Sequence, residues 1–235
     1  MMKEVNLKVG LTPPHACSYL PQQQEQLLVL LDKNRLNAQD YEQLLSAGFR
    51  RSGSDIYRPH CQGCTACQSL RIDVAHFAPT RSQKRIARNN RDIDITVSDT
   101  DHPAYFELYQ RYINQRHLDG AMYPASHRQY EGFVLCDWLP PTFIEFRLEQ
   151  KLVAVAVTDT LSQSMSAMYT FFEPALAHRS LGTFAVLTQL KIAQQTAKQW
   201  LYLGYQVDEC AKMNYKQHFR PHQRLIAGTW HGMKD

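Results

Sequence analysis

The sequence lacks the long apolar runs that mark membrane spans and export signals. Its longest apolar stretches are Leu27–Leu31 and Leu152–Val157, far below the roughly 20 residues that a membrane-spanning helix needs. Residues 1–10 hold no apolar segment behind a basic one, so they do not indicate a secretory signal. We therefore expect a cytoplasmic protein with no membrane partner. Because cytoplasmic thiols stay reduced, the six cysteines need an explanation other than disulfides.

Several catalytic motifs are also missing. The sequence contains no Gly-x-Ser-x-Gly elbow, no P-loop, no dinucleotide-binding glycine pattern and no pair of metal-ligand histidines. The positive charge is in small excess, with a net charge of +4 and a pI near 8.7. Such an excess permits a nucleic-acid partner without requiring one, so the position of the basic residues matters more than their number.

What is present is an ordinary globular composition, with 44% hydrophobic and 20% charged residues in 235 positions. Apolar periodicity predicts helices over residues 22–33, 37–47, 83–91, 104–116, 129–138 and 179–198. It predicts strands over 69–74, 93–97, 143–147, 152–159, 166–171, 200–204 and 225–230, a polar turn over 49–53, and short helical turns over 213–218.

The order of elements in the second half is typical of GNAT-like N-acyltransferases. Three strands in a meander are followed by a long helix, a buried strand, a short helix and a last strand. We therefore expect an α+β fold, with a GNAT-like acyltransferase domain over residues 101–235. A smaller N-terminal α/β domain would occupy residues 1–100, with the boundary near Ser98–His102.

Three cysteines recur at every third position, with one more upstream: Cys61, Cys64, Cys67 and Cys17. A tight loop points such thiolates toward one centre, which suits either an iron–sulfur cluster or zinc. The alternative is that they fill small buried spaces as ordinary loop thiols. Cys136 and Cys210 are isolated, and we expect both in the core.

A second motif is a run of basic residues without any acid over positions 81–91. On a helix, Arg81, Lys84, Arg88 and Arg91 share one face, and Arg85 lies beside them. Such a stripe fits a phosphate backbone, although a solvated helix face is the simpler interpretation.

A third motif is the end of the strand that contains Gly204, which is followed by Tyr205 and then by Lys212 and Lys216. Reacting groups are often carried at such strand ends. Tyr205 can donate a hydrogen bond or relay a proton, or it can simply pack beneath a loop.

Taken in order, eight short motifs resemble the arginyl-tRNA–protein transferase family from about Cys17 to Leu225. They are Cys17–Tyr19, Gly48–Gly53, Tyr57–Pro59, Leu70–Arg71, Leu152–Asp159, Ser180–Gly182, Tyr202–Tyr205 and Lys212–Lys216. Within the family the chain resembles the bacterial branch that transfers leucine. Leu20 and Thr65 stand where eukaryotic members carry further cysteines, so Cys61 and Cys67 are expected to complete any metal site with Cys17 and Cys64.

The resemblance implies a transfer of leucine from leucyl-tRNA to the α-amine of proteins that begin with Asp or Glu, which marks them for N-degron (N-end rule) degradation. No cofactor is required for the chemistry, because the ester is already activated. The implied acceptor-binding residues are Arg50, Arg51 and Arg71, and the implied catalytic residues are Asp159, Tyr169 and Tyr205. The residues implied to bind tRNA are Arg81, Lys84, Arg85, Arg88, Arg91, Lys212 and Lys216.

Three other functions remain open at this point. One is transfer of arginine from arginyl-tRNA to the same acceptors. Another is acetyl-CoA-dependent N-acetylation, which predicts a glycine-rich turn before Thr183, where only Gly182 is found. The last is an RNA-binding module without turnover that is held together by a metal. Such a module would not need the acyltransferase-like half of the chain.

Overall fold

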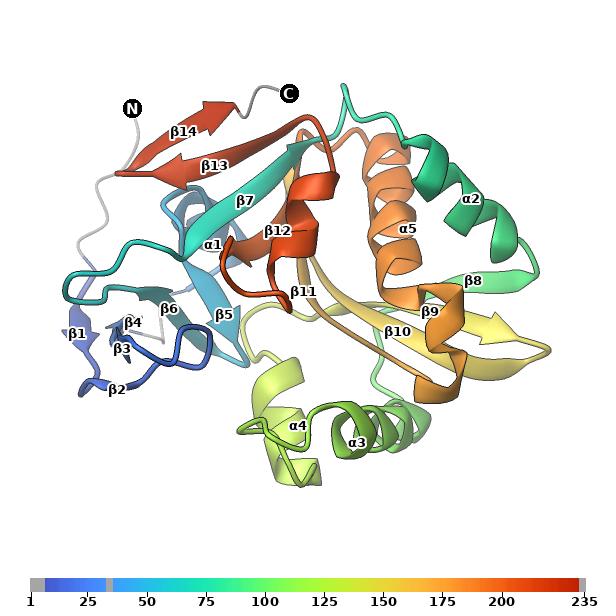
Figure 1. Cartoon of the computed structure of the whole chain (residues 1–235), viewed down its shortest axis with the longest axis horizontal. Helices are drawn as coiled ribbons and strands as arrows, with labels where there is room; N and C mark the ends of the chain where they lie inside the picture. Colours follow the sequence, from blue (N-terminus) through green and yellow to red (C-terminus); the bar gives the residue numbers. More distant parts are fainter. Residues whose placement is uncertain (1–6, 33–35, 233–235) are drawn as a thin grey trace.

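The computed structural model describes residues 7–32 and 36–232 (Figure 1). A large mixed sheet has the strand order β14-β13-β7-β12-β11-β10-β9-β8. Its strands are β7 (Gln68–Asp73), β8 (Ile93–Ser98), β9 (Thr142–Leu148), β10 (Lys151–Thr160), β11 (Ser164–Phe172), β12 (Trp200–Gln206), β13 (His222–Ile226) and β14 (Thr229–Gly232).

A second, four-stranded antiparallel sheet comes from the N-terminal part of the chain, in the order β1-β4-β6-β5. Its strands are β1 (Val9–Leu11), β4 (Leu27–Leu30), β5 (Arg50–Ser52) and β6 (Asp55–Pro59), and β2 (His15–Ala16) pairs with β3 (Gln24–Glu25) nearby. The helices are α1 (Ala38–Ser46), α2 (Arg81–Asn89), α3 (Pro103–Arg116), α4 (His127–Val134) and α5 (Leu181–Gln195), with 3-10 helices η2 (Pro174–Arg179) and η3 (Asn214–His218).

Strand β10 lies at the centre of the core and is buried on both faces, which explains its continuous apolar sequence. On one face Ala154 and Ala156 pack with α5 through Phe184. On the other face Val155 and Val157 pack in a cluster with aromatic side chains of α3 and α4. Helices α5 and α2 therefore cover one side of the sheet, and α3 and α4 lie on the other side (Figure 1).

The pairing of β11 with β12 is short. These strands run parallel and pair only over Ser164–Ser166 and Trp200–Tyr202. Beyond Tyr202, β12 pairs with β7 alone, while β11 pairs with β10 alone. The sheet is therefore split between the later residues of β11 and β12. The meander β9-β10-β11, then α5, then the parallel strand β12, confirms the expected α+β class and the acyltransferase order of elements.

Most predicted elements are confirmed, with helix α1 capped by Asn37 and helix α2 capped by Thr80. The helix predicted over residues 22–33 is wrong, because the described part forms β3 and β4. Five consecutive apolar residues, Leu27–Leu31, suit a buried strand as well as a helix. Here β1 and β6 pair with β4 on its two sides. Residues 50–52, predicted as a turn, form β5.

Three boundaries also differ from the prediction. The strand predicted over 225–230 is a hairpin, because Ala227 and Gly228 both have positive φ and turn the chain. Ser180 adopts a left-handed conformation, with φ of 55°, and separates η2 from α5. The helix predicted over 129–138 ends at Val134.

The boundary expected near residue 100 falls between β8 and α3. Strands from both sides of it pair in the large sheet, since β8 pairs with β9 and β7 pairs with β12. The two sequence regions thus share one layer, and the division into two domains stays a prediction. Within the described ranges, no helix is long and apolar enough to cross a membrane.

Candidate active site at the split between β11 and β12

Arg50 spans the split in the large sheet. Its Nη2 donates to the carbonyl oxygen of Ala167 on β11 at 2.8 Å. Its guanidinium lies against Gly204 on β12, where an added Cβ would sit 3.2 Å from Arg50 Cζ. Gly204 also has a φ of +80°, a conformation that favours glycine. Arg50 is 7% exposed, and its Nη1 has no hydrogen-bond partner among the described residues.

Arg51 and Asp159 form an ion pair with each other in the interior. Arg51 Nη2 lies 2.6 Å and Nε 2.7 Å from Asp159 Oδ1, and neither side chain is exposed. Tyr41 donates to the other carboxylate oxygen at 3.3 Å. This pairing does not fit the two separate roles expected for these residues, because each charge is already neutralised by the other. The pair instead links β5 to β10.

Arg71 lies in a different place. Its guanidinium is stacked between the rings of Trp200 and Trp230, at 3.8 and 4.1 Å from their centroids, and it donates twice to Gln223. It lines a groove along α1 that shares no lining residue with the cavity described below. Of the three arginines expected to bind the acceptor, Arg50 is the one that lies at the split.

The two tyrosines expected to act in catalysis flank the split from opposite strands. Tyr205 on β12 donates to the carbonyl oxygen of Gly48 at 2.9 Å. Tyr169 on β11 packs edge-on against Phe133, with ring centroids 5.0 Å apart. Burial raises the pKa of both phenols well above the ordinary value. Both therefore remain protonated at neutral pH and can donate hydrogen bonds, but they cannot act there as bases.

Lys216 is buried, which the sequence did not predict. It is 5% exposed, and its Nζ donates to the carbonyl oxygen of Tyr205 at 2.6 Å. Burial and the neighbouring charge of Arg50 lower its pKa to about 7. The expected contact with tRNA phosphate at the surface does not fit this burial. Lys212 is exposed and pairs with Asp119 at 3.2 Å, so it remains available at the surface.

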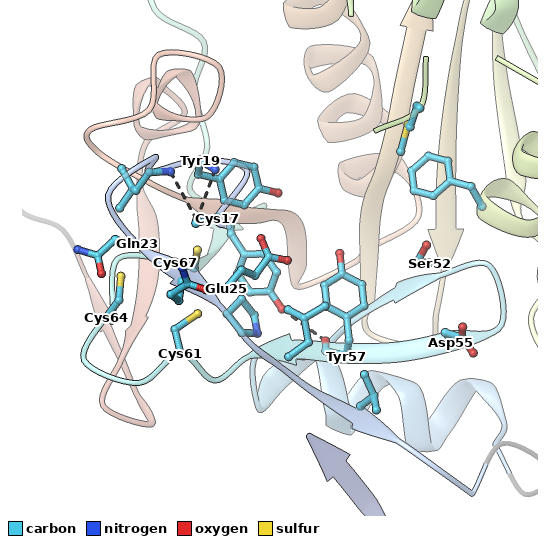
Figure 2. A pocket seen from close by; sticks show the side chains of 18 residues that line it. Cys17, Tyr19, Gln23, Glu25, Ser52, Asp55, Tyr57, Cys61, Cys64 and Cys67 are labelled. Carbon is cyan, nitrogen blue, oxygen red and sulfur yellow. Dashed lines mark hydrogen bonds between the residues drawn. The ribbon is translucent and has the colours of Figure 1, made fainter. Parts of the chain in front are cut away.

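A cavity of about 360 Å³ adjoins this region through Tyr205. Figure 2 shows the side chains that line this cavity. Tyr205 forms part of its wall, together with Tyr57 from β6 and with Met122 and Phe133 from the α3–α4 region. These side chains give it a mainly apolar wall near the split. Apart from Tyr205 and Tyr57, the residues of this wall could not be predicted from the sequence, because they lie far apart along the chain.

The four cysteines expected to bind metal line the far side of the same cavity. Figure 2 shows Cys17, Cys61, Cys64 and Cys67 together, with Ser52 and Asp55 at the other side. All four thiols are half-buried. Burial, together with the other three thiols, raises the pKa of the Cys67 thiol to about 12.

This donor set has the chemistry of a soft-metal site, because a bound cation favours the thiolate form of all four groups. Backbone N–H groups of Tyr19 and Leu20 already point at Cys17 Sγ, at 3.4 and 3.5 Å. However, nowhere in residues 7–32 and 36–232 do three His, Cys, Asp or Glu side chains lie close enough together to hold a metal ion. The four thiols therefore line the same side of the cavity, but they do not surround one common point closely enough to hold a metal ion. Cys136 is buried as expected, whereas Cys210 is half-buried.

The predicted basic stripe lies on and just after α2. Gln83, Ile86 and Asn90 turn toward the protein, and Gln83 completes a capping box with Thr80. The opposite face is exposed and carries Arg81, Lys84, Arg85 and Arg88, and Arg91 follows the helix. The one-sided exposure is confirmed, while its binding of tRNA stays a prediction.

Two family models match this chain. The model for the N terminus of arginine-tRNA-protein transferase matches residues 15–85, and the model for its C terminus matches residues 104–226. An aspartate/glutamate leucyltransferase of Aeromonas hydrophila subsp. hydrophila is 61% identical over 98% of this chain and 97% of that protein. One of Pseudoalteromonas atlantica is 54% identical over 95% of this chain and 96% of that protein.

Likeness to solved structures is weaker. The crystal structure of FemX aligns with a TM-score of 0.46 at 8% identity, over 84% of this chain and 79% of that chain. The family is therefore assigned from the two matching family models and from the relatives. This chain belongs to the arginine-tRNA-protein transferase family.

Proposed function

We propose that this protein transfers leucine from leucyl-tRNA to the α-amine of proteins that begin with Asp or Glu, and so marks them for N-degron degradation. The observation that carries the proposal is the match of both family models, together with full-length relatives named aspartate/glutamate leucyltransferase. The split sheet with Arg50 across it supports an acyl transfer at this place. Charged tRNA as donor also implies a cytoplasmic location.

The reaction needs positioning more than activation. The free acceptor amine attacks the ester carbonyl carbon of leucyl-tRNA, a C–N bond forms, and the ester C–O bond breaks. The amine loses a proton, and the terminal ribose oxygen of the tRNA gains one. No redox change and no cofactor is involved, so the enzyme's main contribution is to hold amine and ester together.

The described residues suggest how the two substrates are held. The apolar wall formed by Tyr57, Met122 and Phe133 suits the leucyl side chain, which binds best in a small apolar pocket. Arg50 suits the acidic side chain of the acceptor, because an arginine with a free N–H recognises carboxylates well. The exposed stripe on α2, with Lys212, suits the phosphates of the tRNA acceptor stem.

The four thiols have the donor chemistry for a structural zinc ion or iron–sulfur cluster, and they would have to move closer together to bind it. When bound, such a group would tie the Cys61–Cys67 loop to Cys17 and so stabilise one wall of the cavity. The chemistry of transfer would not involve it.

The test is transfer of radiolabelled amino acid from charged tRNA to peptides that begin with Asp, Glu, Lys or Ala. Leucyl-, arginyl- and phenylalanyl-tRNA serve as parallel donors. We expect leucine on the Asp and Glu peptides alone. Arginine on these peptides would correct the donor, and no transfer from any donor would refute the proposal.

A further inference from the structure

Two cationic side chains from distant parts of the sequence contact consecutive residues of β12 in the interior. Arg50, from β5, lies against Gly204. Lys216, from η3, donates to the carbonyl of Tyr205. Both contacts occur where β12 no longer pairs with β11. Each side chain is more than nine-tenths buried, so the two charges share one poorly solvated region.

Charges this deeply buried are normally paired with an opposite charge. Within the described part of the chain, neither Arg50 nor Lys216 forms an ion pair with a carboxylate. The groups that act on Lys216 are the Arg50 charge, which opposes its protonation, and the thiols of Cys67 and Cys210, which weakly favour it. Arg50 Nη1 has no hydrogen-bond partner among the residues described. The arrangement is therefore one anion short of charge balance.

We propose that Arg50 and Lys216 together form one subsite that binds the side-chain carboxylate of the acceptor's N-terminal Asp or Glu. This inference rests on the proposed function and adds Lys216 to it as a residue that determines specificity. A carboxylate accepts hydrogen bonds from the guanidinium and the ammonium at once. The amide of Asn or Gln carries no charge, so it would leave both cations unbalanced, which gives a physical basis for discrimination between isosteric acceptors.

The burial of the subsite favours a carboxylate over a tRNA phosphodiester as the anion. A phosphodiester is joined to a nucleoside on either side and needs an open groove, whereas these nitrogens lie inside the protein. The tip of a short side chain needs much less room. Tyr205, whose carbonyl oxygen accepts from Lys216, also lines the cavity of about 360 Å³.

The experiment compares kcat/KM for peptide pairs that differ only in charge, Asp against Asn and Glu against Gln, with leucyl-tRNA held constant. We expect Lys216→Met to reduce the preference for the acid over the amide by about 10- to 100-fold, the range for one lost hydrogen bond to a charged group. Lys216→Arg keeps the charge and should keep most of the preference. Circular dichroism checks that each variant folds.

Lys198→Met is the matched control. Its ammonium also donates to backbone carbonyls, those of Leu161 and Ser162, but at a different place in the fold. This variant should leave the acid-to-amide preference unchanged. If Lys216→Met does not fold, Arg50→Gln tests the same subsite from the other side and should show the same loss of preference.

Other outcomes overturn the inference. If Lys216→Met lowers transfer to acid and amide peptides equally, Lys216 has only a structural or general catalytic role. If it weakens leucyl-tRNA binding and reduces the salt dependence of that binding, the anion is a phosphate. In both cases wild-type transfer of leucine to Asp and Glu peptides would still stand, so the proposed function is judged separately by the wild-type protein.

Discussion

Stability should depend on pH through Lys216. An unfolded lysine has a pKa of 10.5, and burial beside Arg50 lowers the folded value to about 7. Between these two values the unfolded state binds more protons than the folded state, so the free energy of unfolding rises with pH. For this group alone, the expected gain between pH 7 and pH 9 is about 2 kcal/mol.

The assay is urea denaturation followed by circular dichroism at pH 7, 8 and 9, under reducing conditions because of the free thiols. Wild type is compared with Lys216→Met, so that the titration of other groups cancels in the difference. The free energy of unfolding of the wild type should rise relative to the variant as pH increases. Lys198→Met is the control and should show no such trend. A wild-type-minus-variant difference that stays flat over this range would refute the assignment of Lys216 as a buried, uncompensated cation.

Two further predictions concern charges elsewhere. Asp159→Asn should cost about 3–5 kcal/mol of stability in urea denaturation, because it leaves the buried guanidinium of Arg51 without its counter-charge; a loss below about 1 kcal/mol would contradict this. Changing Arg81, Lys84 and Arg88 together to Gln should weaken leucyl-tRNA binding at low salt. The slope of the logarithm of the binding constant against the logarithm of the salt concentration should become shallower by about 0.7–0.9 for each phosphate that α2 no longer neutralises. An unchanged slope would mean that the α2 stripe is only a solvated face.

Local patterns allowed much of the fold to be predicted. The apolar period of α3, the uninterrupted apolar run of β10 and the Thr80 cap of α2 act over a few residues, and the structure has each of them. The prediction was wrong for the described part of residues 22–33, where five adjacent apolar residues do not reveal which face is buried. There the neighbouring strands β1 and β6 decided the conformation.

The candidate site was harder to predict, because its residues act on one another through space. The sequence indicated Arg50, Arg51, Asp159 and Lys216 as candidate site residues. It could not indicate that Arg51 and Asp159, 108 positions apart, neutralise each other. Nor could it show that Arg50 remains without a carboxylate partner in the described structure.

By itself, the sequence determined the order of elements, the basic stripe of α2, the spacing of the cysteines and the resemblance to a family, since all of these depend on residues close together in the chain or on their order along it. Only the tertiary structure decided which charges are paired, which are buried and which face the split between β11 and β12. The reason is that burial and pairing depend on distances between strands. Those distances are fixed by how β5, β12 and η3 pack, and no local pattern encodes them.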